Sequence, residues 1–213
     1  MTITSIVPVD KRKCKVFVDE GFAFVLCKGE IGRLGLAEGA NLSEELYRQI
    51  ETELLNRRAR ERSVDLLKAS DKSESQIRSR LEEDGFPQPV IDRTIALLKK
   101  HRYVDDEAFA RRYVENGGTR KSRRQLAYEL RQKGVDSELV DEALREAAPP
   151  EEETVRRLVQ KKVGNPGDLS REELQKLYAF LGRKGYSYEV IRRVIGEICD
   201  EYQCCLLYTS RCV

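Results

Sequence analysis

The chain has 213 residues, with 39 Lys or Arg and 37 Asp or Glu, giving a formal net charge of +2. Charged residues make up 36% of it, against about 25% in a typical globular protein, which favours a charged helical fold over an all-β one. There is no apolar run of about 18 residues and no signal-peptide pattern, so we expect a cytoplasmic protein without a membrane span. The six cysteines lack CxxC spacing and His101 is the only histidine, so we expect neither disulfides nor a metal or other cofactor.

The N-terminal part, residues 1–42, is predicted to be a small β-rich region. Three short runs rich in β-branched and aromatic residues predict strands: Ile3 to Val7, Cys14 to Val18 and Phe22 to Cys27. The last two flank Asp19-Glu20-Gly21, which predicts a hairpin turn. Three short strands need a partner surface, so we expect this sheet to pack on the helix that follows. The spacing of Gly29, Gly32, Gly35 and Gly39 does not match a GxGxxG motif, and we interpret these residues as turns.

A connecting helix is predicted over residues 43–56. Ser43 is a suitable N-cap, and Leu46, Ile50 and Leu54 recur at helical spacing. The helix becomes basic from Arg57 onward.

From there the sequence repeats itself three times, with glycines 85, 134 and 185 in register. Each glycine follows a leucine by four residues and precedes apolar residues by six and ten: Leu81, Ile91 and Ile95; Leu130, Val140 and Leu144; Leu181, Ile191 and Ile195. This pattern predicts helix, glycine stop, helix. With a preceding helix at about 57–69, 105–115 and 150–163, it predicts three-helix repeats over 57–101, 102–148 and 149–204. The predicted fold class is mainly α, an elongated array of three tandem three-helix repeats with a small β-rich N-terminal region.

Capping residues support these helices. Ser73 with Gln76 and Ser170 with Glu173 match capping boxes, and Asp136, Ser187 and Asp105 are placed to cap further helices. His101 is expected to end a helix near its negative pole.

The segment 205–213 is expected to be foreign to the protein. Cys205-Leu-Leu-Tyr-Thr-Ser210 is the translation of TGTCTCTTATACACATCT, which resembles a transposase adapter used in preparing sequencing libraries. The reverse complement of that adapter accounts for Arg211-Cys212-Val213. We therefore leave these residues out of the fold and function predictions.

The charge is unevenly distributed along the chain. Residues 56–133 carry 20 basic and 13 acidic groups, whereas residues 134–160 carry 3 and 8. The densest cationic site lies in the second repeat, around a single acid, Glu129. Its candidate contact residues for an acidic partner or nucleic acid are Arg112, Arg120, Lys121, Arg123, Arg124, Arg131 and Lys133. A solvated helix face flanking a buried stripe of Leu126 and Leu130 is the alternative interpretation, and Arg123 and Arg124 should lie outside that stripe. If five of these groups contact phosphates, the logarithm of the binding constant should fall with the logarithm of the salt concentration at a slope of roughly −4.5.

Two further function classes are less favoured. A helix-turn-helix reader would use the helix after each glycine, but in the second repeat this helix carries Asp136, Glu138, Asp141, Glu142 and Glu146, which would repel phosphates. For catalysis, Asp105 and Asp106 near His101 have no nucleophile motif, phosphate-binding loop or second histidine beside them. We expect the protein not to be an enzyme.

Four segments of the repeats form a specific set of motifs in a fixed order. They are Ser73-Glu-Ser-Gln-Ile-Arg-Ser-Arg-Leu81 with Gly85-Phe86, Tyr103-Val-Asp-Asp-Glu-Ala-Phe-Ala-Arg-Arg-Tyr-Val114, Arg123-Arg-Gln-Leu with Glu129-Leu-Arg-Gln-Lys-Gly-Val135, and Phe180-Leu-Gly-Arg-Lys-Gly-Tyr-Ser-Tyr-Glu-Val-Ile191. Together they resemble the bacterial RecX family, the regulators of the RecA recombinase. The match spans about 57–202. It departs from the family pattern at Gly117-Gly118-Thr-Arg-Lys-Ser122, where a glycine directly before the basic pair is expected.

The resemblance implies a monomeric modulator, commonly an inhibitor, that lies in the groove of the RecA filament on single-stranded DNA. It would act in DNA repair, the SOS response and homologous recombination by blocking filament extension and ATP hydrolysis. Some direct affinity for DNA is also implied, and no membrane partner. Two alternatives stay open: a stand-alone helical DNA-binding regulator, and a helical scaffold for an unrelated partner.

Overall fold

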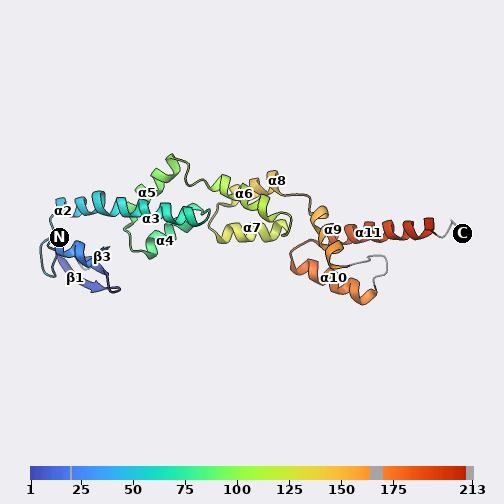
Figure 1. Ribbon diagram of the computed structural model, residues 1–213, viewed down its shortest axis with the longest axis horizontal. Helices are drawn as coiled ribbons and strands as arrows, with labels where there is room; N and C mark the ends of the chain where they lie inside the picture. Colours follow the sequence, from blue (N-terminus) through green and yellow to red (C-terminus); the bar gives the residue numbers. More distant parts are fainter. Residues whose placement is uncertain (20, 164–169, 210–213) are drawn as a thin grey trace. The chain divides into compact units, whose positions relative to one another are not determined.

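The computed structural model describes residues 1–19, 21–163 and 170–209, with side chains through Cys199. The chain forms two compact units, Met1–Asp105 and Asp106–Val213. It is mainly helical with one three-stranded sheet at its N-terminus, as predicted (Figure 1). None of the helices in the described part of the chain is long and apolar enough to cross a membrane.

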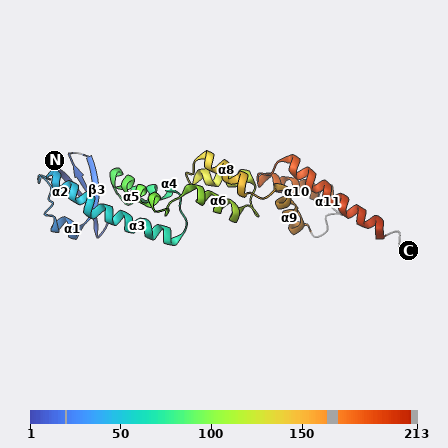
Figure 2. The same ribbon diagram turned by 90° about the horizontal axis from the view of Figure 1, so that it is seen from above.

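The strands of the N-terminal sheet pair antiparallel in the order β1-β2-β3. Their bounds are β1 Ile3–Pro8, β2 Lys13–Val18 and β3 Gly21–Cys27, close to the predicted runs. Val18 pairs with Gly21 across the predicted hairpin turn, whose Glu20 lies outside the described residues. One face of the sheet is apolar and buries Val16, Phe24 and Leu26 completely. These side chains share a core with the helix that follows, and Figure 2 shows the strands beside α2 and α3.

Two of the four glycines predicted as turns lie instead in a short helix, α1 (Lys28–Arg33). Gly35 and Gly39 do form turns, with positive φ of 64° and 79°. Gly29 and Gly32 are helical because Glu30 stabilises the helix start. The Glu30 carboxylate accepts a hydrogen bond from the Cys27 N–H at 2.7 Å and forms an ion pair with Arg58 at 3.0 Å.

The connecting helix and the first helix of repeat one are continuous, with a π-helical segment between them. They run as α2 Glu44–Gln49, the π-helix η1 Ile50–Leu55 and α3 Asn56–Ala69. Ser43 caps the start as predicted, since its hydroxyl accepts the Leu46 N–H at 3.1 Å. The wider π turn carries Leu55 into the core at 0% exposure. Leu54, which recurs at helical spacing with Ile50, is only partly buried.

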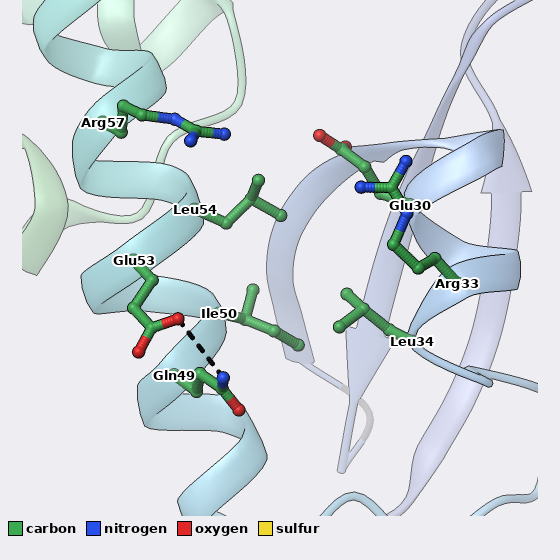
Figure 3. Close-up of a pocket in the computed structure, with 8 residues that line it drawn as sticks. All are labelled: Glu30, Arg33, Leu34, Gln49, Ile50, Glu53, Leu54 and Arg57. Atoms are coloured by element: carbon green, nitrogen blue, oxygen red, sulfur yellow. Dashed lines mark hydrogen bonds between the residues drawn. The ribbon is translucent and has the colours of Figure 1, made fainter.

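Leu54 lies instead at a hollow of about 190 Å³ between α1 and η1. Figure 3 shows Leu34, Ile50 and Leu54 pointing toward one another, with charged side chains around them. These charged side chains are Glu30, Arg33, Glu53 and Arg57.

The glycine stop of each repeat has the predicted left-handed conformation. The φ angles of Gly85, Gly134 and Gly185 are 82°, 74° and 89°. In each repeat the residue after the glycine donates its backbone N–H to the carbonyl of the leucine that lies four residues before the glycine, at 3.0, 3.2 and 3.3 Å. This pattern is that of a Schellman cap. The helices joined by these caps are α4 Glu74–Glu83 with α5 Gln88–Lys100, α7 Arg123–Gln132 with α8 Ser137–Ala147, and α10 Arg171–Arg183 with α11 Tyr188–Thr209.

Four of the predicted helix starts are also confirmed, and the cap predicted at Asp105 stays a prediction. Ser73 with Gln76 and Ser170 with Glu173 form capping boxes, and Asp136 and Ser187 accept N–H groups of α8 and α11. His101 is the C-cap of α5, as predicted. Two further helices precede the pairs in the second unit, α6 Asp106–Gly117 and α9 Glu151–Lys162. The segment predicted to be foreign continues α11 to Thr209, and its last four residues lie outside the described residues. Its origin stays a prediction.

In the second unit each repeat has its own core, and hydrogen bonds join the two repeats. Phe109, Leu126 and Leu130 belong to one core, whereas Leu177 and Leu181 belong to the other. The Ser122 hydroxyl donates to the carbonyl of Lys184 at 2.7 Å, and the Thr154 hydroxyl donates to that of Gly118 at 3.2 Å. A side chain at Gly118 would be 2.5 Å from Pro149 Cδ, which explains the glycine in this unusual loop.

Candidate partner-contact surface on the second repeat

The seven predicted contact residues come from α6, from the loop after it and from α7 with its C-cap. Arg112 lies on α6, Arg120 and Lys121 lie in the loop, and Lys133 is the C-cap of α7. The remaining three, Arg123, Arg124 and Arg131, lie on α7. The structure separates three groups: an inner group around Tyr113, two arginines that bond to other residues of the second unit, and an exposed outer face.

The inner group surrounds Tyr113 and Glu129. The Glu129 carboxylate accepts hydrogen bonds from the Tyr113 hydroxyl at 2.5 Å and from the Gln125 amide at 3.1 Å, and it also pairs with the Lys121 ammonium. The Lys121 and Lys133 ammonium groups lie 5.3 and 5.4 Å from the centroid of the Tyr113 ring, within range of a cation–π contact. The charge of Lys121 is therefore largely neutralised by Glu129 inside the repeat.

The pKa shifts of this group agree with its geometry. Burial, and then the hydrogen bond to Glu129, raise the pKa of Tyr113. The hydrogen bond to Glu129 raises the pKa of Lys121, against the effect of burial. Burial acts to raise the pKa of Glu129, but the hydrogen bonds from Lys121, Tyr113 and Gln125 together outweigh it and lower that pKa. Each shift favours the charge state that holds the group together.

Arg123 and Arg131 are exposed, as expected outside the apolar stripe, but both have partners within the second unit. The Arg123 guanidinium donates to the Ala148 carbonyl at 3.3 Å, and its backbone N–H donates to the Glu151 carboxylate at 2.9 Å. Arg123 thus helps to join repeat two to the start of α9. Arg131 forms an ion pair with Asp141 of α8 at 3.3 Å.

The outer face consists of Arg120, Arg124 and Tyr128. Both arginines are exposed, and neither forms an ion pair with a side chain that the structure describes. Tyr128 follows Arg124 by one helical turn on α7 and is 63% exposed. The sequence prediction missed Tyr128, although its i+4 spacing from Arg124 and its place off the Leu126–Leu130 stripe were both visible. Arg112 is also exposed, on α6.

This surface is suited to binding rather than to chemistry. Arginine guanidinium groups form bidentate hydrogen bonds with carboxylates and phosphates. An exposed tyrosine ring offers a flat face on which an apolar side chain or a nucleobase can pack. The acids of α8 that argued against groove reading are partly paired, Asp141 with Arg131 and Glu146 with Arg111.

The fold and this surface define a protein of tandem three-helix repeats whose candidate site is an exposed face. The comparisons with known proteins agree with this class. Residues 59–98, 105–144 and 150–195 match the first, second and third three-helix domains of RecX. A "Regulatory protein RecX" of Caldanaerobacter subterraneus subsp. tengcongensis is 30% identical over 200 residues, which are 92% of this chain and 99% of that protein. The chain belongs to the RecX family of regulatory proteins.

Other relatives and two solved structures are consistent with this assignment. The regulatory protein RecX of Amycolatopsis mediterranei is 33% identical over 68% of this chain and 86% of its own. A crystal structure of regulatory protein RecX has a TM-score of 0.59 at 25% identity, covering 91% of this chain and 98% of that one. The crystal structure of RecX from Lactobacillus salivarius shares the fold, with a TM-score of 0.61 at 20% identity, over 68% of this chain and 96% of that one.

Proposed function

We propose that the protein binds the RecA filament on single-stranded DNA and inhibits its extension, its ATP hydrolysis and recombination. It acts by binding, as a cytoplasmic monomer, and not as an enzyme. The observation that carries this proposal is the similarity to regulatory RecX proteins over 92% of the chain. The resemblance of its motifs to the regulators of RecA supplies the partner.

The outer face is the part of the second repeat that we assign to the contact. Lys121, Arg123 and Arg131 already have partners within the unit, so Arg120 and Arg124 are the better candidates for an external anion. A partner surface rich in carboxylates would complete their hydrogen bonding, and Tyr128 would supply apolar contact area.

The test is the ATP turnover of RecA on single-stranded DNA with increasing amounts of the purified protein. We expect the turnover to fall, and we expect the variant Arg120→Glu/Arg124→Glu to need at least about fivefold more protein for the same effect. Arg123 is left unchanged, because a carboxylate there would lie beside Glu151 and loosen the junction of the two repeats. The Cβ and Cδ atoms of Arg124 also lie beside Gly185 of repeat three, so the double variant must unfold at the same urea midpoint as the wild type for its loss to be assigned to the contact.

The matched control is Arg145→Glu on α8, which reverses an exposed charge in the same repeat. It should inhibit like the wild type, and circular dichroism should show equal helix content in all three proteins. If the wild type in stoichiometric excess leaves turnover unchanged, inhibition is refuted. A rise in turnover would instead identify a positive modulator.

Direct DNA binding is a second candidate function, favoured by the exposed ring of Tyr128 one turn from Arg124, which forms no ion pair with a described side chain. Fluorescence anisotropy with labelled single-stranded and duplex oligonucleotides, in the absence of RecA, tests it. Internal pairing lowers the number of cations available, so we expect two contacts on a single strand and a salt slope of about −1.4, in place of −4.5. Tight, sequence-selective duplex binding without RecA would favour the stand-alone regulator.

A further inference from the structure

A second hollow, lined mainly by polar residues, lies in the first unit between α3 and α5. Its volume is about 200 Å³. Each helix contributes residues one turn apart, because Asn56 and Arg60 are spaced i and i+4 on α3, as are Arg93 and Leu97 on α5. The lining residues are Asn56, Arg60, Arg93, Thr94 and Leu97.

Two of the residues that line this hollow each have a buried polar atom with no hydrogen-bond partner in the described part of the chain. These atoms are the amide oxygen of Asn56 and the hydroxyl of Thr94, whose residue is only 2% exposed. Buried polar atoms are nearly always hydrogen-bonded, so two unpaired ones on residues that line one hollow indicate that something else satisfies them. Threonine at position 94 has no other evident role there, because Ile91, Ile95 and Leu98 supply the apolar face of α5.

The charges around the hollow select the kind of ligand. Arg93 Nη2 is 2.9 Å from the Glu51 carboxylate, which the π-helix η1 holds in a largely buried position. Arg60 Nε donates to the backbone carbonyl of Asn56 at 3.1 Å. Each guanidinium has five N–H donors, so both retain donors for another group. With two guanidinium groups and one carboxylate, the site has an excess positive charge that favours an anion.

We propose that this hollow binds a phosphate group. A tetrahedral oxyanion can accept from Arg60, from Arg93 and from the Thr94 hydroxyl, and a half-turn of the Asn56 amide presents a further donor. A single water molecule would satisfy the two unpaired atoms. It would still leave Arg60 without an anion among the described side chains, because the Glu51 carboxylate is paired with Arg93. The phosphate comes either from free inorganic phosphate or from the phosphodiester of a nucleic-acid strand. This site is independent of the function proposed for the second repeat.

The test is isothermal titration of the full chain with inorganic phosphate, against sodium chloride at the same ionic strength. We expect phosphate binding in the wild type and a loss of about tenfold or more in Arg60→Gln and in Thr94→Val. Arg57→Gln is the matched control. It removes the same charge three residues earlier on α3, at a 64% exposed side chain that lines the hollow of Figure 3.

Thermal unfolding provides a second measurement that a purely structural role would not reproduce. Without phosphate, Thr94→Val should melt at a higher temperature than the wild type, because it removes an unpaired hydroxyl from the core. With millimolar phosphate, the wild type and Arg57→Gln should gain stability, whereas Thr94→Val and Arg60→Gln should not. Equal gains in all four proteins, or no phosphate binding by the wild type, would overturn the proposal.

Competition with a short single-stranded oligothymidylate distinguishes the two sources of the phosphate. If the oligonucleotide displaces inorganic phosphate and Arg60→Gln weakens its binding, the site takes a phosphodiester. If phosphate stays bound in excess oligonucleotide, the site takes the free anion. An acidic peptide that binds the hollow in place of phosphate would refute the assignment.

Discussion

Tyr186→Phe should stabilise the protein, although it removes a polar group from a residue of the third repeat. Tyr186 follows the glycine cap of that repeat and is 4% exposed, and its hydroxyl is buried without a hydrogen-bond partner in the described structure. The equivalent residues of the other repeats, Phe86 and Val135, are apolar. An unsatisfied buried polar group costs about 1–3 kcal/mol, and phenylalanine keeps the ring while removing that cost. We expect the free energy of unfolding to rise by about 1 kcal/mol at pH 7.

The pH dependence of this effect has a defined sign. Burial, and secondarily the charge of Glu151, raise the pKa of Tyr186 to about 12, from an ordinary value of 10.0. Between these two values the unfolded tyrosine loses its proton while the folded one keeps it, so the wild type loses stability as pH rises. At pH 11 the loss reaches about 1.4 kcal/mol. The advantage of Tyr186→Phe over the wild type should therefore grow from pH 9 to pH 11.

Urea unfolding followed by circular dichroism measures both effects. A gain of about 1 kcal/mol corresponds to an increase of roughly 0.3–0.5 M in the urea midpoint at unchanged m-value. Tyr128→Phe is the control, because its hydroxyl is on an exposed residue and its removal should change the free energy by less than about 0.5 kcal/mol. A destabilised Tyr186→Phe, or an advantage that does not grow with pH, would refute the reasoning.

Two further predictions concern the cores of the repeats. Leu130→Ala should lower the free energy of unfolding by about 2–5 kcal/mol, because Leu130 is fully buried; a loss below about 1 kcal/mol in urea titration would contradict this. Gly85→Ala should also destabilise, because the new Cβ would lie 2.2 Å from Val25 Cγ2 at a φ of +82°. Val25→Ala removes that methyl group. The double variant should therefore lose less free energy of unfolding than the two single variants lose together, by about 0.5–3 kcal/mol. Additive losses would argue against the contact.

The repeats could be predicted from the sequence because their signals are local. A capping box such as that of Ser73 and a glycine stop such as Gly134 act within one helical turn, and the i, i+4 leucines identify the buried face directly. Helix α1 could not be predicted in this way, because two glycines in six residues disfavour a helix. Its formation depends on the ion pair of Glu30 with Arg58, which are 28 residues apart in the sequence.

The candidate site was predictable in its location but not in its internal division. The basic cluster of the second repeat was visible as composition alone. The pairing of Lys121 with Glu129 was not, because it spans eight residues from a loop to α7 and depends on Tyr113 from the preceding helix. The contact of Arg123 with Ala148 likewise depends on how the chain enters α9. Tertiary pairing thus decides which cations are available to a partner, and composition does not report it.

The two glycine caps whose surroundings are described have the same backbone geometry but different neighbours. At Gly185 the space beside the cap is occupied by Ser122 and Arg124, from the start of α7 in the preceding repeat. At Gly85 it is occupied by Val25 of the N-terminal sheet. The sheet therefore covers the glycine cap of repeat one, as the start of α7 in repeat two covers the glycine cap of repeat three. A tandem array needs a cover for the apolar surface of its first unit. The strands supply this cover, since Val16 and Phe24 on one face share a core with Leu81 of repeat one, and Val25 on the other face lies beside Gly85. The β-rich region is therefore best understood as the end cap of the helical repeats.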